Sequence, residues 1–217
     1  MKRTLAAALM LVVGAAYANT EASAPGAAAK AAAPTKAELM ARGQQIASSV
    51  CVACHGLDGA SAVAANPNIG GMPEQYIAKQ LAAFKSAERK NPIMQGMVAN
   101  LTQEDMTALG MYYFSQRPKT AAIARDAALA GKGQKIYRAG IAELKIPACA
   151  GCHGGAGAGI PAAYPRLAGQ WPDYALAQLK AYASGERKNA QMNAITARMR
   201  ESDMLAVVDY MAGMRAR

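Results

Sequence analysis

Four cysteines and two histidines form two copies of one pentapeptide, and the chain has no other residue of either type. Residues 51–55 read C-V-A-C-H and residues 149–153 read C-A-G-C-H. Two thiols three positions apart can each form a thioether with one vinyl group of a porphyrin, and the adjoining histidine can then bind its iron. The spacing predicts two covalently attached c-type haems, with these attachment residues: Cys51, Cys54, His55, Cys149, Cys152 and His153.

Two other kinds of site also use paired cysteines. A C-x-x-C pair in an exported protein can be a redox-active disulfide, and such pairs also bind zinc. A zinc site does not require a histidine directly after the second cysteine in both copies, and no strand–helix pattern of a thioredoxin-like domain surrounds either motif. The repetition of the whole pentapeptide therefore favours haem.

The sixth iron ligand must be another residue type, because both histidines already serve as first ligands. Methionine, lysine and an open position remain. The two halves of the chain correspond at an offset of 98 residues, and only Met94 with Met192 and Met106 with Met204 are methionine pairs at that offset. Met106 and Met204 fall inside a predicted helix and are expected in the core. Met94 and Met192 are expected in loops and are the candidate ligands, with Met97 as the rival in the first half.

The elements that position these residues follow an export signal. Residues 1–18 combine Lys2 and Arg3, an apolar stretch and an Ala-x-Ala sequence, which is the pattern of a cleavable signal peptide. An uncleaved membrane anchor is the alternative. Residues 19–35 are rich in Ala, Pro, Thr and Ser and are expected to form a disordered spacer. Because c-type haem is attached outside the cytoplasm, export agrees with the haem motifs and predicts a periplasmic protein.

The first half of the chain, residues 36–117, has helical patterns and no alternating strand pattern. Thr35 is predicted to cap a helix to about residue 48 that leads into the first haem motif. Pro73 fits the start of a second helix, which we expect to fade near residue 91. A loop is expected over residues 91–100, and Thr102 is expected to cap a final helix to about residue 116.

The second half, residues 126–217, repeats the first after a predicted linker at residues 118–125. The 98-residue offset also aligns two Glu-Arg-Lys-Asn segments, at residues 88–91 and 186–189. Upstream of the haem motifs the offset is 90, so the second half has eight extra residues before its motif. Duplication accounts for this pattern and predicts an all-α fold of two small domains, each held together by its haem.

The charge of the chain limits its partners. The formal net charge is +10, or +8 without Lys2 and Arg3, and the four propionates of two haems would reduce it further. This charge suits an acidic partner protein or an anionic membrane surface. Nucleic acid is excluded, because the chain is exported and lacks interleaved aromatic and basic residues. Arg89 and Arg187, in the repeated segments, are expected at solvated helix ends; the weaker hypothesis is that they neutralise propionates or form a docking rim.

The order of motifs in each half is similar to that of a known protein family. Pro67 and Pro165 each lie twelve residues after a motif histidine, in P-N-I-G-G and P-R-L-A-G. The order of haem motif, proline segment, methionine and terminal helix resembles class I cytochrome c. That resemblance implies that the proline carbonyl accepts a hydrogen bond from the proximal histidine. It also places Gly43 and Gly133 where the first helix of each half crosses the last, near Tyr112 and Tyr210.

Two such domains in tandem resemble the dihaem cytochrome c4 family over about residues 36–217. The resemblance implies two haems with His/Met ligation, packed across a pseudo-two-fold interface. It implies an electron carrier in periplasmic respiration, often beside the membrane, with a quinol-oxidising complex or another cytochrome as donor and a terminal oxidase or reductase as acceptor.

An enzyme is the rival interpretation. A dihaem peroxidase or a thiosulfate-oxidising dehydrogenase would need an open or exchangeable iron, and a peroxidase would also need a nearby acid–base group. Both histidines are committed to haem, and the carboxylates are scattered along the helices without a paired arrangement. The sequence therefore predicts an electron-transfer protein without catalytic residues.

Overall fold

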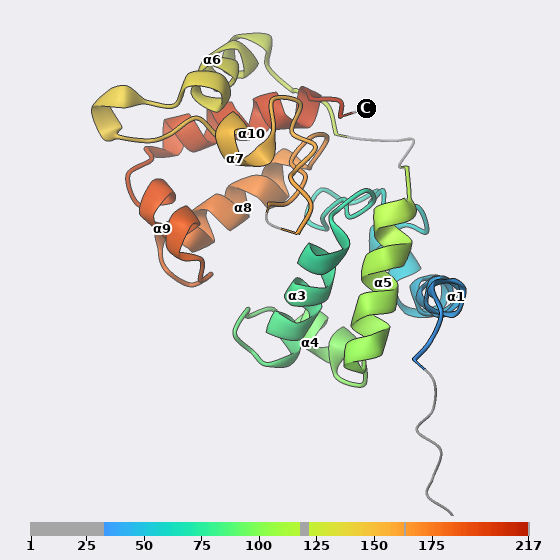
Figure 1. Ribbon diagram of the computed structural model, residues 1–217. Coiled ribbons are helices and arrows are strands. Elements are labelled where there is room, and N and C mark those ends of the chain that lie inside the picture. Colours follow the sequence, from blue (N-terminus) through green and yellow to red (C-terminus); the bar gives the residue numbers. More distant parts are fainter. Residues whose placement is uncertain (1–32, 118–121, 163, 217) are drawn as a thin grey trace, which may run out of the picture. The chain divides into compact units, whose positions relative to one another are not determined.

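The structure is a computed structural model that describes residues 33–117, 122–162 and 164–216 (Figure 1). Residues 34–217 form one compact unit, whereas the predicted signal peptide and most of the predicted spacer lie outside the described residues. Within the described ranges the chain forms helices and loops, and its only β-type pairings are the isolated bridges Ile141–Ile146 and Ile160–Tyr164. The all-α prediction is confirmed.

The first half places its haem motif on one continuous helical segment. Its elements are α1 (Lys36–Ile46), the π-helical turn η1 (Ala47–Cys51), α2 (Val52–His55), α3 (Glu74–Lys85), α4 (Pro92–Val98) and α5 (Gln103–Ser115). Thr35 caps α1 as predicted: its hydroxyl accepts from the Glu38 backbone N–H at 3.3 Å, and the Glu38 carboxylate accepts from the Thr35 N–H at 2.7 Å. Because η1 and α2 follow α1 without a break, the two thiols of the motif are held about one helical turn apart, and the histidine directly follows the second thiol.

Two expectations for the first half were wrong. Helix α3 ends at Lys85 instead of fading near residue 91, and the predicted loop over residues 91–100 contains α4. The Asn91 side chain caps α4 by accepting from the Met94 backbone N–H at 2.9 Å, and Pro92 occupies the first helical position. Proline fits there because its missing N–H would have no helical partner. Pro92 therefore begins a helix within the segment that was expected to be a loop.

The second half repeats this arrangement. Its elements are α6 (Ala127–Ala139), the 3₁₀ turn η2 (Ala142–Leu144), α7 (Ala150–His153), α8 (Pro172–Ala183), α9 (Ala190–Thr196) and α10 (Glu201–Gly213). The extra residues before the second haem motif form a small loop around η2, which the bridge between Ile141 and Ile146 closes. Helix α9 forms although Ala190 replaces the proline of α4, because Asn189 supplies the same cap.

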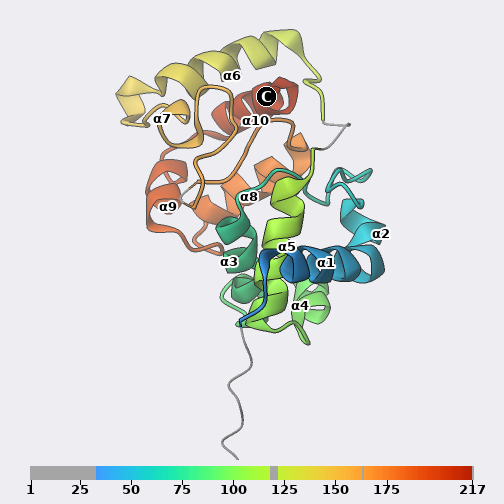
Figure 2. The ribbon, with the colours of Figure 1, turned by 45° about the vertical axis from the view of Figure 1, so that its right-hand side comes forward.

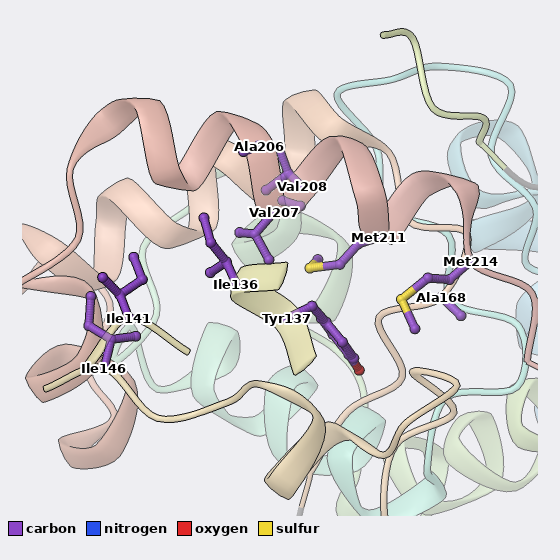
Figure 3. Packing of buried hydrophobic residues seen from close by; sticks show 11 residues of the cluster. Ile136, Tyr137, Ile141, Ile146, Ala168, Ala206, Val207, Val208, Met211 and Met214 are labelled. Carbon is purple, nitrogen blue, oxygen red and sulfur yellow. The ribbon is translucent and has the colours of Figure 1, made fainter. Parts of the chain in front are cut away.

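Each half has a hydrophobic core of its own. In the first half, Ile46 and Ile77 pack with Leu109 and Tyr113. In the second half, buried residues of α6 and α10 form a separate cluster, which Figure 3 shows around Tyr137. Met106 and Met204 are 3% and 4% exposed, as expected for core residues.

The first and last helices of each half cross at a glycine. Figure 2 shows α1 lying across α5. A Cβ on Gly43 would collide with the Ala108 carbonyl oxygen and lie 2.9 Å from the Tyr112 Cβ. A Cβ on Gly133 would collide with the Ala206 carbonyl oxygen in the same way. The crossing predicted from the resemblance is confirmed in both halves, and it requires a residue without a side chain.

The two halves are joined by polar contacts. Asn68 donates from its backbone N–H to Gln170 Oε1 at 2.9 Å, and Gln170 Nε2 donates back to the Asn68 carbonyl at 2.9 Å. The Trp171 indole donates to the Ser61 carbonyl at 3.1 Å. These bonds use backbone groups of loops near the first haem motif, so the loop conformation and the contact between the halves depend on each other.

A buried aspartate connects the crossing helices in each half. Asp105 on α5 accepts from Arg42 Nε at 2.7 Å, and Asp203 on α10 lies 2.9 Å from Lys132 Nζ and accepts from Arg200 Nε at 2.6 Å. Burial alone would raise the pKa of Asp203, but the contacts with Lys132 and Arg200 outweigh it and hold the pKa below its ordinary value. Asp203 is therefore charged at neutral pH although its side chain is 0% exposed.

Replacing Asp203 with asparagine is expected to lower the free energy of unfolding at pH 7 by about 2–3 kcal/mol, because two half-exposed cations lose a buried partner. A carboxylate with a depressed pKa contributes stability above its unfolded pKa of about 3.9 and loses it as pH falls through the lower folded value. The difference between Asp203→Asn and the parent protein should therefore shrink below about pH 4. Denaturant unfolding at several pH values measures this.

Asp173→Asn is the matched control for that prediction. Asp173 pairs with Arg125 at 2.8 Å, but both side chains are more than half exposed. Such a pair contributes less than about 1 kcal/mol. A deficit for Asp203→Asn that was the same at pH 7 and pH 3 would contradict the assigned charge.

Candidate haem sites

Each motif histidine is buried and hydrogen-bonded to the carbonyl of the proline that follows it by twelve residues. The Nδ1 atom of His55 lies 3.0 Å from the Pro67 oxygen, and that of His153 lies 2.9 Å from the Pro165 oxygen. A carbonyl oxygen can only accept, so Nδ1 carries the proton and Nε2 keeps a free lone pair. Burial lowers the pKa of both histidines, which favours the neutral form that binds a metal.

The first cysteine of each haem motif is in a largely buried position. Burial raises the pKa of Cys51, and it raises that of Cys149 to about 11. Thiols held protonated are poor metal ligands and poor redox nucleophiles. Among the described residues, no group of three or more His, Cys, Asp or Glu side chains could hold a metal ion. Within the described residues, neither motif therefore has the further side chains that a structural zinc site needs.

The candidate sixth ligands occupy the same position in the two halves. Met94 is the third residue of α4 and Met192 the third residue of α9, and both are half-buried. The Met192 backbone N–H donates to the Asn189 side chain at 3.0 Å, which reproduces the contact between Met94 and Asn91. Met97 lies one turn further along α4 and is 50% exposed. A ligand sulfur needs a fixed approach to the iron, and only the capped position offers it in both halves.

Two buried tyrosines near the haem motifs were missed in the sequence. Tyr113 is 1% exposed, and its hydroxyl lies beside the Cys51 thiol of the first haem motif. Its counterpart in the second half is Met211, whereas Tyr137 fills the space from α6 and donates to the Gly154 carbonyl at 2.7 Å. The sequence did offer one signal: at the 98-residue offset, Tyr113 of the first half corresponds to a methionine in the second half. The environments of the two sites therefore differ in polarity.

The residues present fit a covalently attached haem in each half. Two thiols at the right spacing, a histidine with Nε2 available and a half-buried methionine are in place in each half. The cysteines would hold the porphyrin, and the histidine and methionine would hold the iron. When bound, haem supplies one-electron chemistry between ferric and ferrous iron.

No helix in the described part of the chain is long and apolar enough to cross a membrane.

Comparisons with known proteins agree with this site. The family model for cytochrome c matches residues 40–113 and 130–215, one segment in each half. Cytochrome c4 of Thiocapsa roseopersicina is 39% identical over 191 residues, which cover 85% of this chain and 97% of that protein. The thiosulfate dehydrogenase electron acceptor of Stutzerimonas stutzeri is 39% identical over 177 residues, covering 79% of this chain and 82% of that protein.

A solved structure shows the same fold. Reduced recombinant cytochrome c4 from Pseudomonas stutzeri superimposes with a TM-score of 0.76 at 33% identity, over 81% of this chain and 98% of that one. Both halves are therefore class I cytochrome c domains, and both haem motifs lie in matched segments. The chain belongs to the dihaem cytochrome c4 family, and it is an electron carrier with two covalently attached c-type haems.

Proposed function

We propose that this electron carrier works in the periplasm and has His/Met ligation at both irons, His55 with Met94 and His153 with Met192. One observation carries this proposal: in each half, a proline carbonyl orients the histidine and an asparagine cap fixes the helix that bears the methionine. Two protein ligands close the coordination sphere, and methionine raises the reduction potential by favouring ferrous iron. A closed iron suits electron transfer and leaves no position for a substrate.

The donor we propose is a quinol-oxidising complex or another cytochrome, and the acceptor is a terminal oxidase or reductase. A thiosulfate-oxidising enzyme is a second candidate donor, because a relative 39% identical to this chain is named a thiosulfate dehydrogenase electron acceptor. The net positive charge favours donors and acceptors with acidic docking faces, and it supports peripheral contact with an anionic membrane surface.

The donor can be identified by measuring reduction of the purified haem-loaded protein in two reactions. One contains a quinol-oxidising complex with its quinol, and the other contains a thiosulfate dehydrogenase with thiosulfate. The physiological donor should reduce both haems at a rate that falls as ionic strength rises, because electrostatic attraction speeds the encounter. Slow reduction by both donors at every ionic strength would contradict the proposed donors.

The enzyme alternative is a dihaem peroxidase or thiosulfate dehydrogenase with one open iron. An electron carrier with two closed irons should not bind carbon monoxide readily in its ferrous state, and it should show no turnover with peroxide or thiosulfate alone. Rapid carbon monoxide binding by one haem equivalent, together with turnover of either substrate, would overturn the electron-carrier proposal in favour of the enzyme.

A further inference from the structure

The second half contains a cavity that is separate from its haem site. The cavity has a volume of about 430 Å³, opens to solvent, and is lined by Arg138, Gly155, Ala156, Tyr210, Met214 and Arg215. These residues come from the end of α6, the turn after the second haem motif and the end of α10. Among the described residues, the haem attachment residues and Met192 do not line it. A space of this size can hold a small ligand.

Two arginines of this cavity have no carboxylate partner. Arg138 Nε donates to the Tyr210 hydroxyl at 3.4 Å. Arg215 Nη1 donates at 2.9 Å to the carbonyls of Ala212 and Met214. In the described ranges no carboxylate lies within 4.0 Å of either guanidinium, and neither the two Nη atoms of Arg138 nor Nη2 of Arg215 has a protein acceptor. Both side chains therefore keep free donors.

Arginines at the contact between the halves use their donors inside the protein. Arg89 and Arg187 each donate to the side-chain oxygens of both Gln80 and Gln178. Arg187 is 7% exposed and Arg89 is half-buried, so these two are not the solvated helix ends expected from the sequence. Their guanidinium groups are fully partnered, whereas those of the cavity are not.

The Tyr210 hydroxyl is a further donor at the cavity. In the first half, the corresponding Tyr112 hydroxyl donates to the Leu57 carbonyl at 3.0 Å. In the second half, Tyr137 from α6 donates instead to the Gly154 carbonyl of the corresponding turn at 2.7 Å. The Tyr210 O–H has no acceptor among the described residues, so it can donate to a ligand.

The first half has two side chains at the corresponding turn that the second half lacks. At the 98-residue offset, Leu57 corresponds to Gly155 and Asp58 to Ala156. Burial and the charge of Asp58 raise the pKa of Tyr112, so a carboxylate lies near the tyrosine of the first half. The second half has the space of the missing leucine side chain and no such carboxylate. An anion in the cavity would supply the missing negative charge.

We propose that this cavity binds a small oxyanion such as inorganic phosphate, with Arg138, Arg215 and Tyr210 as its donors. Guanidinium groups suit oxyanions because they form charge-assisted hydrogen bonds in a fixed fork. The charges around Arg215 also favour a negative ligand: burial, with the charges of Arg117 and Arg215, lowers the pKa of Arg166. The proposal is independent of which donor and acceptor the carrier uses.

A bound anion should affect the second haem more than the first. All residues that line the cavity belong to the second half, and Gly155 lies two positions after His153. A negative charge near a haem favours ferric iron over ferrous iron, so it should lower the reduction potential. The distribution of an electron between the two haems would then depend on the anion.

The test measures binding of inorganic phosphate to the haem-loaded full chain by isothermal titration calorimetry, with chloride at equal ionic strength as the reference. Arg138→Gln removes one guanidinium group. Lys135→Gln is the matched control, because Lys135 is exposed on the same helix and does not line the cavity. Reduction potentials of both haems are measured with and without phosphate. The absorption spectrum of each variant without phosphate shows whether its haem sites are unchanged.

Gly155→Leu tests the cavity without changing the charge. It introduces the residue that the first half has at this position. A Cβ on Gly155 would meet nothing within 4 Å, and its φ lies outside the left-handed region, so the backbone accepts a side chain there. The leucine side chain should occupy part of the space that the oxyanion needs.

Phosphate should bind the parent protein and lower the potential of the second haem more than that of the first. Arg138→Gln should weaken binding by about tenfold or more, because a charged donor is lost. Lys135→Gln should leave binding nearly unchanged, because its charge is screened by water and salt. Gly155→Leu should weaken binding as Arg138→Gln does. No binding to the parent protein, or equal binding to all three variants, would overturn the proposal.

Discussion

Replacing Met94 with alanine is expected to lower the reduction potential of the first haem by on the order of 0.1–0.3 V, because axial ligand identity shifts haem potentials over about 0.8 V. The variant should also lose one of the two equivalents of the long-wavelength ferric methionine-to-iron band and should bind carbon monoxide at one ferrous haem. Met192→Ala should do the same to the second haem. Absorption spectroscopy and redox titration of the haem-loaded variants measure each effect.

Met97→Ala is the matched control, since it removes the rival sulfur from the same short helix. Its side chain is half-exposed and lies outside the repeated position. This variant should keep both equivalents of the band and both potentials. A spectrum in which Met97→Ala, and not Met94→Ala, loses the band would show that the ligand of the first haem was assigned to the wrong residue.

Replacing Gly133 with alanine is expected to lower the free energy of unfolding by about 3 kcal/mol or more, because overpacking a tight contact forces the backbone to move. The new Cβ would collide with the carbonyl oxygen of Ala206, and the Tyr210 Cβ would lie 2.9 Å away. Neither group is the end of a flexible side chain. Denaturant unfolding of the haem-loaded variant measures the loss, and Gly43→Ala should show the same effect in the first half.

Gly131→Ala provides the control in the same helix. A Cβ at Gly131 would meet nothing within 4 Å, so alanine there should stabilise the protein by up to about 1 kcal/mol through its higher helix propensity. If Gly131→Ala and Gly133→Ala had equal effects, the crossing would not require glycine.

The role of Arg187 could not be predicted from the sequence, although its segment was recognised as a repeat. A Glu-Arg-Lys-Asn segment at the end of a helix is usually solvated, and here Lys188 is exposed. Arg187 is buried because the facing half supplies Tyr76 and Gln80 as partners. Residues more than a hundred positions away decide its environment, and no local pattern records them.

The sequence by itself determined the attachment residues and the duplicated fold, because covalent haem attachment requires C-x-x-C-H at a fixed spacing and a repeat preserves its offsets. It also predicted the caps at Thr35 and Thr102, since capping depends on residues within one turn. Only the tertiary structure decided that residues 92–98 are helical, that Tyr113 is buried beside the first haem motif, and that two arginines share their acceptors across the halves. These features depend on which surfaces meet after folding, and contacts between distant segments leave no periodic signal in the chain.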